Sequence, residues 1–188
     1  VINSLGALHH FDKPQNIANT NLLTCIIGGD NQHYYFNKNE AFKICQKITE
    51  IKEYNLNIQI LIITSRRTSS LVKKIFNDNL NNIASIWNGE GENPYEKAIK
   101  ESSFFIVTSD STSMISEATI SGKSIYVYHL PFKRISNRIS NFHKEFSNLG
   151  ITRDVKNIKY LKKWDYNPLN ESERIARIIK KKIIKQNL

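Results

Sequence analysis

The stretch FFIVTSDSTSMISEA, from Phe104 to Ala118, combines an apolar strand, a polar turn and the start of a helix. Its first four residues are uninterruptedly apolar, which is typical of a strand that is covered on both faces of a sheet. A polar run from Thr108 to Ser113 follows, although a helix needs only one capping side chain at its start. The turn therefore has more hydrogen-bonding groups than capping requires, and it is a candidate binding site.

The rest of the chain repeats this alternation of strand and helix. Apolar runs predict strands at 22–27, 58–64, 83–87, 104–108 and 124–130, and helical spacing predicts helices at 37–55, 65–80, 93–102, 111–122, 136–149 and 170–186. We expect Asn37 to cap the first helix, Thr68 or Ser69 the second, and Gly122 to stop the fourth. Five continuously apolar strands separated by helices predict an α/β, Rossmann-like doubly wound parallel sheet.

Length and composition fit one domain. The chain has 188 residues, of which 40% are hydrophobic, and no apolar run approaches the roughly 20 residues that span a bilayer. We divide it into a leading segment or interdomain linker, 1–20, and a domain with a C-terminal helix, 21–188. Because the first residue is Val1 and not Met, we expect a piece of a longer protein.

The cysteines and the charge restrict the compartment and the partners. Cys25 and Cys45 lie in apolar surroundings, which predicts free thiols in a reducing, cytoplasmic compartment, and no Cys or His pair has the spacing of metal ligands. The net charge of +10 favours an anionic partner: nucleic acid, an acidic membrane surface or a phosphorylated small molecule. We rank nucleic acid last, because the sequence has no recognised signature for binding it.

Small and hydrogen-bonding residues follow the first four predicted strands. In a parallel α/β sheet, ligands bind beyond the carboxyl ends of the strands. The loops there contain Gly28, Gly29, Asp30 and Asn31; Ser65, Arg66, Arg67 and Thr68; Asn88, Gly89, Gly91, Asn93 and Pro94; and Ser109, Asp110, Ser111, Thr112 and Ser113. The connections at the opposite edge are merely polar. This asymmetry predicts a site at the carboxyl edge.

Each of these loops also has a simpler interpretation. Gly28 and Gly29 fit an ordinary turn, and adjacent arginines usually form a solvated surface. At the start of a helix, however, a guanidinium group can bind phosphate or carboxylate. Asp110 or Ser111 would suffice as a helix cap, but a helix N-terminus with exposed N–H groups also attracts phosphate.

Glu117 is not explained by capping. A capping box places its acid three residues after the cap, whereas Glu117 lies four residues after Ser113 on the same face of the helix. A carboxylate there could accept the hydroxyls of a ribose while the helix start holds a diphosphate. The simpler alternative is an exposed glutamate on a helix surface.

Several long motifs resemble the mitochondrial-fission ELM family. They are TSRRT, WNGEGENPY, VTSDSTSMISEA, SGKSIYVY, FHKEFSNLGITR and WDYNPLNESERIA, spread from about Gly6 to Ala176. The family is similar to GT-B glycosyltransferases, which have two Rossmann-like domains with a cleft between them. This chain resembles the C-terminal, donor-binding half, and the resemblance implies that the N-terminal half lies outside it.

The resemblance implies roles for individual residues. Glu117 would bind the ribose; Ser111 and Ser113 would contact the diphosphate with help from Arg66 or Arg67; Asn88 and Pro94 would lie near the base. Gly28 and Gly29 would admit the sugar. The complete candidate ligand-binding set is Gly28, Gly29, Ser65, Arg66, Arg67, Asn88, Gly89, Pro94, Ser109, Asp110, Ser111, Ser113, Met114 and Glu117. No further cofactor is implied.

No catalytic residue is assigned, because the base of inverting GT-B enzymes usually comes from the N-terminal domain. His9 and His10 are the only histidines that we place near the cleft. His143 is expected on a helix, facing the loop edge.

Two functions therefore remain open. One is the donor-binding half of a nucleotide-sugar-dependent glycosyltransferase or related epimerase. We expect this half to be inactive by itself. The other is a non-catalytic adaptor, as the plant members of the family are known to be, with peripheral contact to a membrane. Ile175, Ile178, Ile179 and Ile183 form an apolar stripe opposite lysines on the last helix. The stripe suits an anionic membrane, although packing on the domain or on the absent half explains it more simply.

Overall fold

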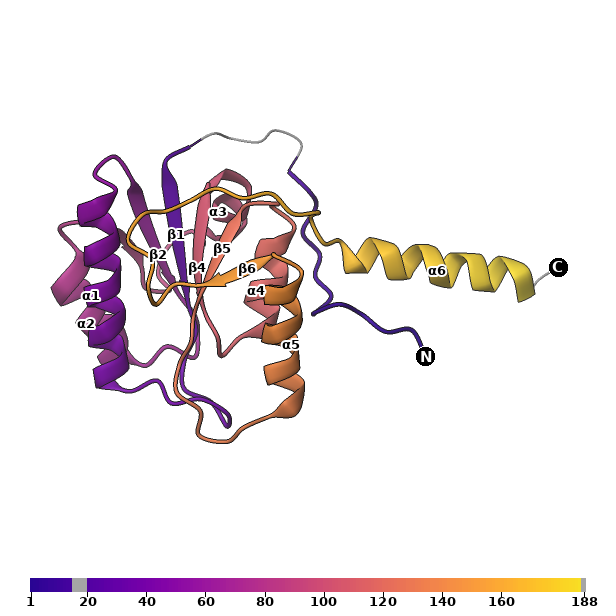
Figure 1. Cartoon of the computed structure of the whole chain (residues 1–188), viewed down its shortest axis with the longest axis horizontal. Coiled ribbons are helices and arrows are strands. Elements are labelled where there is room, and N and C mark those ends of the chain that lie inside the picture. The colour runs from indigo at the N-terminus through magenta and orange to yellow at the C-terminus, as the bar shows by residue number, and fades with distance from the viewer. Residues whose placement is uncertain (15–19, 187–188) are drawn as a thin grey trace.

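Six parallel strands form one sheet in the part of the chain that the computed structural model describes, residues 1–14 and 20–186 (Figure 1). The spatial order is β3-β2-β1-β4-β5-β6, and every neighbouring pair is parallel. The strands are β1 (Leu22–Ile27), β2 (Gln59–Thr64), β3 (Ser85–Trp87), β4 (Phe104–Thr108), β5 (Ser124–Tyr128) and β6 (Thr152–Asp154). The predicted doubly wound, Rossmann-like parallel sheet is confirmed.

Helices cover both faces of the sheet. They are α1 (Lys38–Tyr54), α2 (Ser70–Leu80), α3 (Tyr95–Glu101), α4 (Thr112–Thr119), α5 (Asn137–Asn148) and α6 (Glu171–Gln186). Side chains of β1 alternate between two cores: Cys25 packs in the core that contains α1 and α2, whereas Ile26 packs with residues of α3, α4 and α5. Burial on both faces explains why β1 is apolar at consecutive positions.

Local signals located most helix starts correctly. Asn37 Oδ1 accepts a hydrogen bond from the Glu40 N–H at the start of α1, and Ser69 Oγ accepts one from the Val72 N–H at the start of α2. Cys25 and Cys45 are buried free thiols, as expected.

The count of five strands was wrong, because β6 was not predicted. Its three residues, Thr152–Asp154, are polar, and only Thr152 is buried. A short strand at the edge of a sheet buries too little surface to leave an apolar run in the sequence. Its pairing with β5 is visible only in the folded chain.

The two ends of the chain lie on the same side of the domain (Figure 1). The segment that precedes residue 15 runs past α4 and the start of α6, and residues 15–19 of the proposed linker lie outside the described residues. Helix α6 then projects away from the sheet. Ile179 and Ile183 are 45% and 53% exposed, so these two residues of the stripe do not pack on this domain, whereas packing on the absent half stays a prediction. None of the described helices is long and apolar enough to cross a bilayer.

Candidate functional site

The sheet reverses its winding direction between β1 and β4, which are neighbours in space. From β1 the chain proceeds outward through β2 and β3, and from β4 it proceeds outward through β5 and β6 on the other side. Such a switch point leaves a crevice beyond the carboxyl ends of the two central strands. The loops that begin at Gly28 and Ser109 meet there, at the edge that the sequence predicted.

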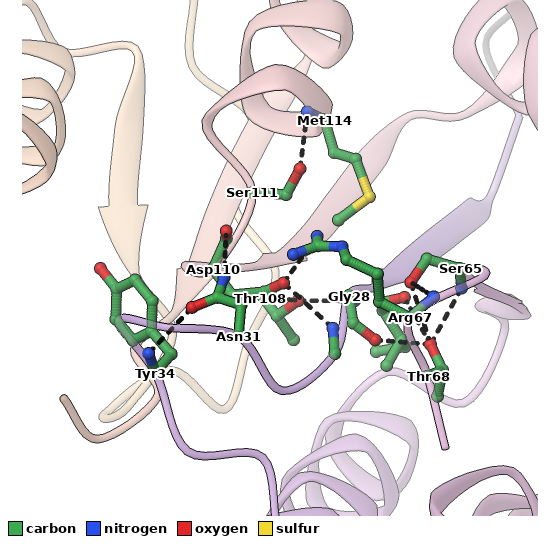
Figure 2. A network of polar contacts seen from close by, with 12 residues as sticks. Gly28, Asn31, Tyr34, Ser65, Arg67, Thr68, Thr108, Asp110, Ser111 and Met114 are labelled. Carbon is green, nitrogen blue, oxygen red and sulfur yellow. Dashed lines mark hydrogen bonds and ion pairs between the residues drawn. The ribbon is translucent and has the colours of Figure 1, made fainter. Parts of the chain in front are cut away.

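Asp110 is the centre of a buried polar network at this switch point (Figure 2). Its carboxylate accepts hydrogen bonds from the Gly29 N–H at 3.0 Å and from the Thr108 hydroxyl at 2.6 Å, and Arg67 Nη2 lies 2.8 Å from Oδ2. Burial raises the pKa of the Asp110 carboxyl, against the opposing effects of Thr108, Gly29 and Arg67. The acid therefore joins three loops to one another.

Gly28 and Gly29 make this network possible. A Cβ atom on Gly28 would collide with the Asp110 carboxylate, and one on Gly29 would collide with the backbone carbonyl of Arg67. The Thr68 hydroxyl also donates to the Gly28 carbonyl at 2.5 Å. The close approach of these loops is a sufficient structural reason for both glycines, while their contact with a sugar stays a prediction.

A cavity of about 860 Å³ opens beside the network, between the loops after β2 and β3 and the helices α3 and α4. Six of the predicted ligand-binding residues line it: Ser65, Arg66, Asn88, Gly89, Met114 and Glu117. Eight further residues complete the lining: Ile26, Ile63, Thr64, Lys73, Trp87, Glu90, Asn93 and Tyr95. The cavity has the size of known small-molecule sites.

Glu117 lies in the wall of this cavity and is only partly exposed, so the interpretation as an exposed surface glutamate is wrong. The Tyr95 hydroxyl donates a 2.5 Å hydrogen bond to Glu117 Oε2. Burial raises the pKa of Glu117, while the Tyr95 hydrogen bond and the charge of His10 act in the opposite direction. A polar carboxylate held inside a cavity is suited to accept hydrogen bonds from a ligand.

The two adjacent arginines point to different places. Arg67 pairs with Asp110, as Figure 2 shows, whereas Arg66 is exposed and lines the cavity. Lys73, also in the lining, donates from Nζ to the Asn88 carbonyl at 2.6 Å. The two basic residues of the lining, Arg66 and Lys73, thus share the cavity with two carboxylates, those of Glu90 and Glu117.

The start of α4 settles which residue caps the helix. Ser111 Oγ accepts from the Met114 N–H at 3.4 Å, so Ser111 is the cap and Asp110 is not (Figure 2). Ser113 is exposed on the first turn, and Ser109 is buried with its hydroxyl accepting from the Leu130 N–H at 3.0 Å. Of these residues only Ser113 keeps an exposed side chain for a ligand.

Pro94 lies apart from the other predicted residues. It lines a separate hollow together with the first residues of three strands, Leu22, Gln59 and Ser85, which belong to the amino edge of the sheet. Pro94 immediately precedes α3 and sets its start. Its predicted position near a base is not supported by this geometry.

The histidines occupy two regions. His143 Nε2 lies 3.0 Å from the Ser109 carbonyl, so His143 faces the loop edge from α5 as predicted. The rings of His10 and Phe11 lie 4.3 Å apart and are tilted by 33°, and the charge of His10 acts on the pKa of Glu117.

Sequence reasoning placed Asn93 in the loop after the third strand but left it out of the ligand-binding set, and it missed Lys73, Trp87, Glu90 and Tyr95. All of these except Lys73 lie in the segment WNGEGENPY, 87–95. The only signal for Tyr95 in the sequence was that it directly follows Pro94, a predicted site residue. The contact of Tyr95 with Glu117 is revealed only when α3 and α4 are brought together in the fold.

Comparisons with known proteins identify similar chains. A family model described as "Mitochondrial fission ELM1" matches residues 1–183. "Uncharacterized protein RP120" of Rickettsia prowazekii (strain Madrid E) is 34% identical over 161 residues, which are 82% of this chain and 45% of that protein. "Mitochondrial fission protein ELM1" of Arabidopsis thaliana is 31% identical over 133 residues, 69% of this chain and 30% of that protein.

Among solved structures, "Crystal Structure of TarM" aligns with 93% of this chain and 30% of that one, at 14% identity and a TM-score of 0.46. The chain spans less than half the length of the curated relatives it matches.

Proposed function

Since the chain belongs to the mitochondrial fission ELM1 family, we propose that it is the donor-binding half of a GT-B-like, nucleotide-sugar-dependent glycosyltransferase or related epimerase. The observation that carries this proposal is the position of Glu117 in a cavity beside the switch point of a doubly wound sheet. A nucleotide diphosphate is the part of the donor that this cavity would bind.

The charges of the cavity suit the two ends of such a ligand. Arg66 offers a planar group with several N–H donors, and the first turn of α4 offers backbone N–H groups near Ser113, both of which favour phosphate oxygens. Glu117 would accept the hydroxyls of the ribose. Trp87, the last residue of β3, and Asn88, in the loop after it, would lie beside the base.

The proposed chemistry is stabilisation of a departing diphosphate. Arg66 and the helix N–H groups would compensate the negative charge that develops as the bond to the sugar breaks. A general base is expected from the rest of a longer protein, as the relatives exceed this chain in length. No residue of this chain is assigned that role.

The test is a thermal-shift panel with UDP, GDP, ADP, CDP and TDP. A ligand present at about 100 times its dissociation constant stabilises a fold by about 2.7 kcal/mol. We expect one nucleotide to stabilise the wild type and to have little effect on Glu117→Ala. Glu53→Ala, an exposed glutamate on α1, is the matched control and should respond like the wild type. Stabilisation by none of the five would contradict the proposal.

The second candidate is a membrane-associated adaptor, and the exposed part of α6 favours it. Ile179 and Ile183 are exposed near Lys180, Lys181 and Lys182 on a helix that projects from the domain. A helix with an apolar stripe and basic residues binds anionic lipid surfaces.

Flotation with vesicles tests the adaptor. The adaptor requires binding to phosphatidylserine vesicles, weaker binding to phosphatidylcholine vesicles, and loss of binding in the double variant Ile179→Asn, Ile183→Asn. Leu56→Asn with Ile135→Asn removes two exposed apolar side chains elsewhere and should leave flotation unchanged. Equal flotation of both double variants would refute a role for α6.

A further inference from the structure

The N-terminal segment is fixed to the domain by backbone hydrogen bonds. The Leu5 N–H donates to Glu171 Oε2 at 2.7 Å, and the Ala7 N–H donates to Ser116 Oγ at 2.9 Å. Residues Glu171 and Ser116 belong to α6 and α4, respectively. Further along the segment, the His9 N–H donates to Ser172 at 3.0 Å. The segment therefore has a defined path across the domain and reaches Phe11 next to the cavity.

Phe11 contacts the ring that holds Glu117. The Phe11 and Tyr95 rings lie 5.8 Å apart at an angle of 53°. Tyr95 in turn donates its 2.5 Å hydrogen bond to Glu117 Oε2 and lines the cavity itself. A continuous series of contacts thus joins the N-terminal segment to the carboxylate.

A free glutamate side chain occupies several rotamers, and binding a ligand then costs the entropy of selecting one of them. The Tyr95 hydroxyl removes this cost by fixing one carboxylate oxygen in advance. The Phe11 ring limits the movement of Tyr95 in the same way. Groups that are fixed before a ligand arrives bind it more tightly than mobile ones.

We propose that Tyr95 is a positioning residue that holds Glu117 for its ligand, and that the segment from Leu5 to Phe11 keeps Tyr95 in place. The inference rests on the proposed function, because the ligand of Glu117 is the nucleotide of that proposal. It makes a segment outside the sheet part of the binding site.

Tyr95→Phe tests the inference, because it keeps the ring and removes only the hydroxyl. We expect about tenfold weaker nucleotide binding, the loss of one hydrogen bond to a charged group. Phe11→Leu should weaken binding in the same direction by a smaller factor. Tyr166→Phe is the matched control: its hydroxyl donates to the Lys123 carbonyl at 2.9 Å, away from Glu117, and its removal should leave affinity unchanged.

A second readout needs no ligand. NMR titration of ¹³C-labelled glutamate carboxyls, with the Glu117 signal identified by its absence in Glu117→Gln, measures the pKa of Glu117. Since the Tyr95 hydrogen bond lowers that pKa against the effect of burial, Tyr95→Phe should raise it. Of the charged groups around the carboxylate, His10 acts on its pKa, and Arg66, Lys73 and Glu90 share the cavity. All four are unchanged in the variant.

The outcomes separate the two proposals. Nucleotide binding that is equal in the wild type and Tyr95→Phe overturns the positioning role and leaves the proposed function standing. A raised Glu117 pKa in Tyr95→Phe, in a protein that binds none of the nucleotides, refutes the proposed function and retains the contact by which Tyr95 positions Glu117. A pKa that is unchanged in Tyr95→Phe overturns the positioning role in either case.

Discussion

Arg67 Nη2 lies 2.8 Å from Asp110 Oδ2, and this ion pair joins the loop after β2 to the loop after β4. The neighbouring Arg66 lines the cavity instead. Two arginines that are indistinguishable in the sequence thus have different surroundings. Arg67 is paired with a buried carboxylate, and Arg66 borders the cavity where a ligand would bind. Their separate roles can be measured.

Arg67→Gln should lower the free energy of unfolding by about 1–2 kcal/mol, because the buried Asp110 carboxylate loses a charged donor. Arg66→Gln should change stability by less than about 0.5 kcal/mol, as is usual for an exposed side chain, and should weaken nucleotide binding about tenfold. Urea unfolding and a binding titration measure the two effects. Equal loss of stability in both variants would contradict the distinction.

Gly28→Ala should destabilise the domain by roughly 1–3 kcal/mol, since the new methyl group would displace the Asp110 carboxylate from its donors. Gly91→Ala is the comparison. Gly91 has a φ of 72° and nothing within 4 Å of its added Cβ, so only the backbone penalty of about 1 kcal/mol applies. The midpoint of urea unfolding measures the loss of stability in each variant. A larger loss for Gly91→Ala than for Gly28→Ala would contradict the claim that the close approach of Gly28 to Asp110 requires a glycine.

His143 should make the fold sensitive to mild acid. Burial, and secondarily the charge of His129, lowers the pKa of His143 to about 4, while its hydrogen bond to the Ser109 carbonyl acts in the opposite direction. The unfolded chain, with a pKa near 6.5, then binds more protons than the folded one as pH falls from 6.5 toward 4. The contribution of neutral His143 to the free energy of unfolding is therefore fully present above pH 6.5. It decreases as pH falls toward 4, by up to roughly 3 kcal/mol.

Urea unfolding at about pH 7.5 and about pH 5 measures this loss. His143→Gln should lose less stability between the two conditions than the wild type, because glutamine does not titrate. An acid loss of the same size in His143→Gln would assign the effect to other groups.

Glu171→Ala should release the N-terminal segment. The Glu171 carboxylate accepts from the Leu5 N–H and is paired with Arg174, whose hydrogen bonds lower the pKa of Glu171. Without the carboxylate, the amide hydrogens of Leu5 and Ala7 should exchange with solvent faster, while those of β1 should not change. Glu173→Ala, on the same helix but exposed, should leave exchange at Leu5 as it is. Unchanged exchange in both variants would refute this anchoring.

The dependence on pH has the same sign for this anchor as for His143. A depressed pKa means that the contribution of Glu171 to stability is present above the unfolded pKa and is lost as pH falls through the folded value. The protection of the Leu5 amide, measured relative to the intrinsic exchange rate at the same pH, should therefore fall in the wild type as pH falls, toward the protection seen in Glu171→Ala.

The candidate site was predictable in its location but only in part in its members. That polar loops would gather at one edge follows from the parallel alternation of strands and helices, and Glu117 was distinguished by its distance from the helix cap. Which of Arg66 and Arg67 borders the cavity was not predictable, because both belong to one short loop and differ only in the direction of their side chains. Pro94 lines a separate hollow near the amino edge, whereas its neighbours Asn93 and Tyr95 line the cavity, and the sequence does not show this difference in direction.

The sequence by itself determined the order of the six helices and of five of the six strands that the structure describes, because helix periodicity, apolar strands and caps such as Asn37 and Ser69 depend on residues a few positions apart. Only the tertiary structure decided that β6 joins the sheet, that Arg67 pairs with Asp110, and that Tyr95 holds Glu117. Each of these contacts joins residues from separate elements of the chain. Their geometry is fixed by the packing of helices on the two faces of the sheet, which no local pattern records.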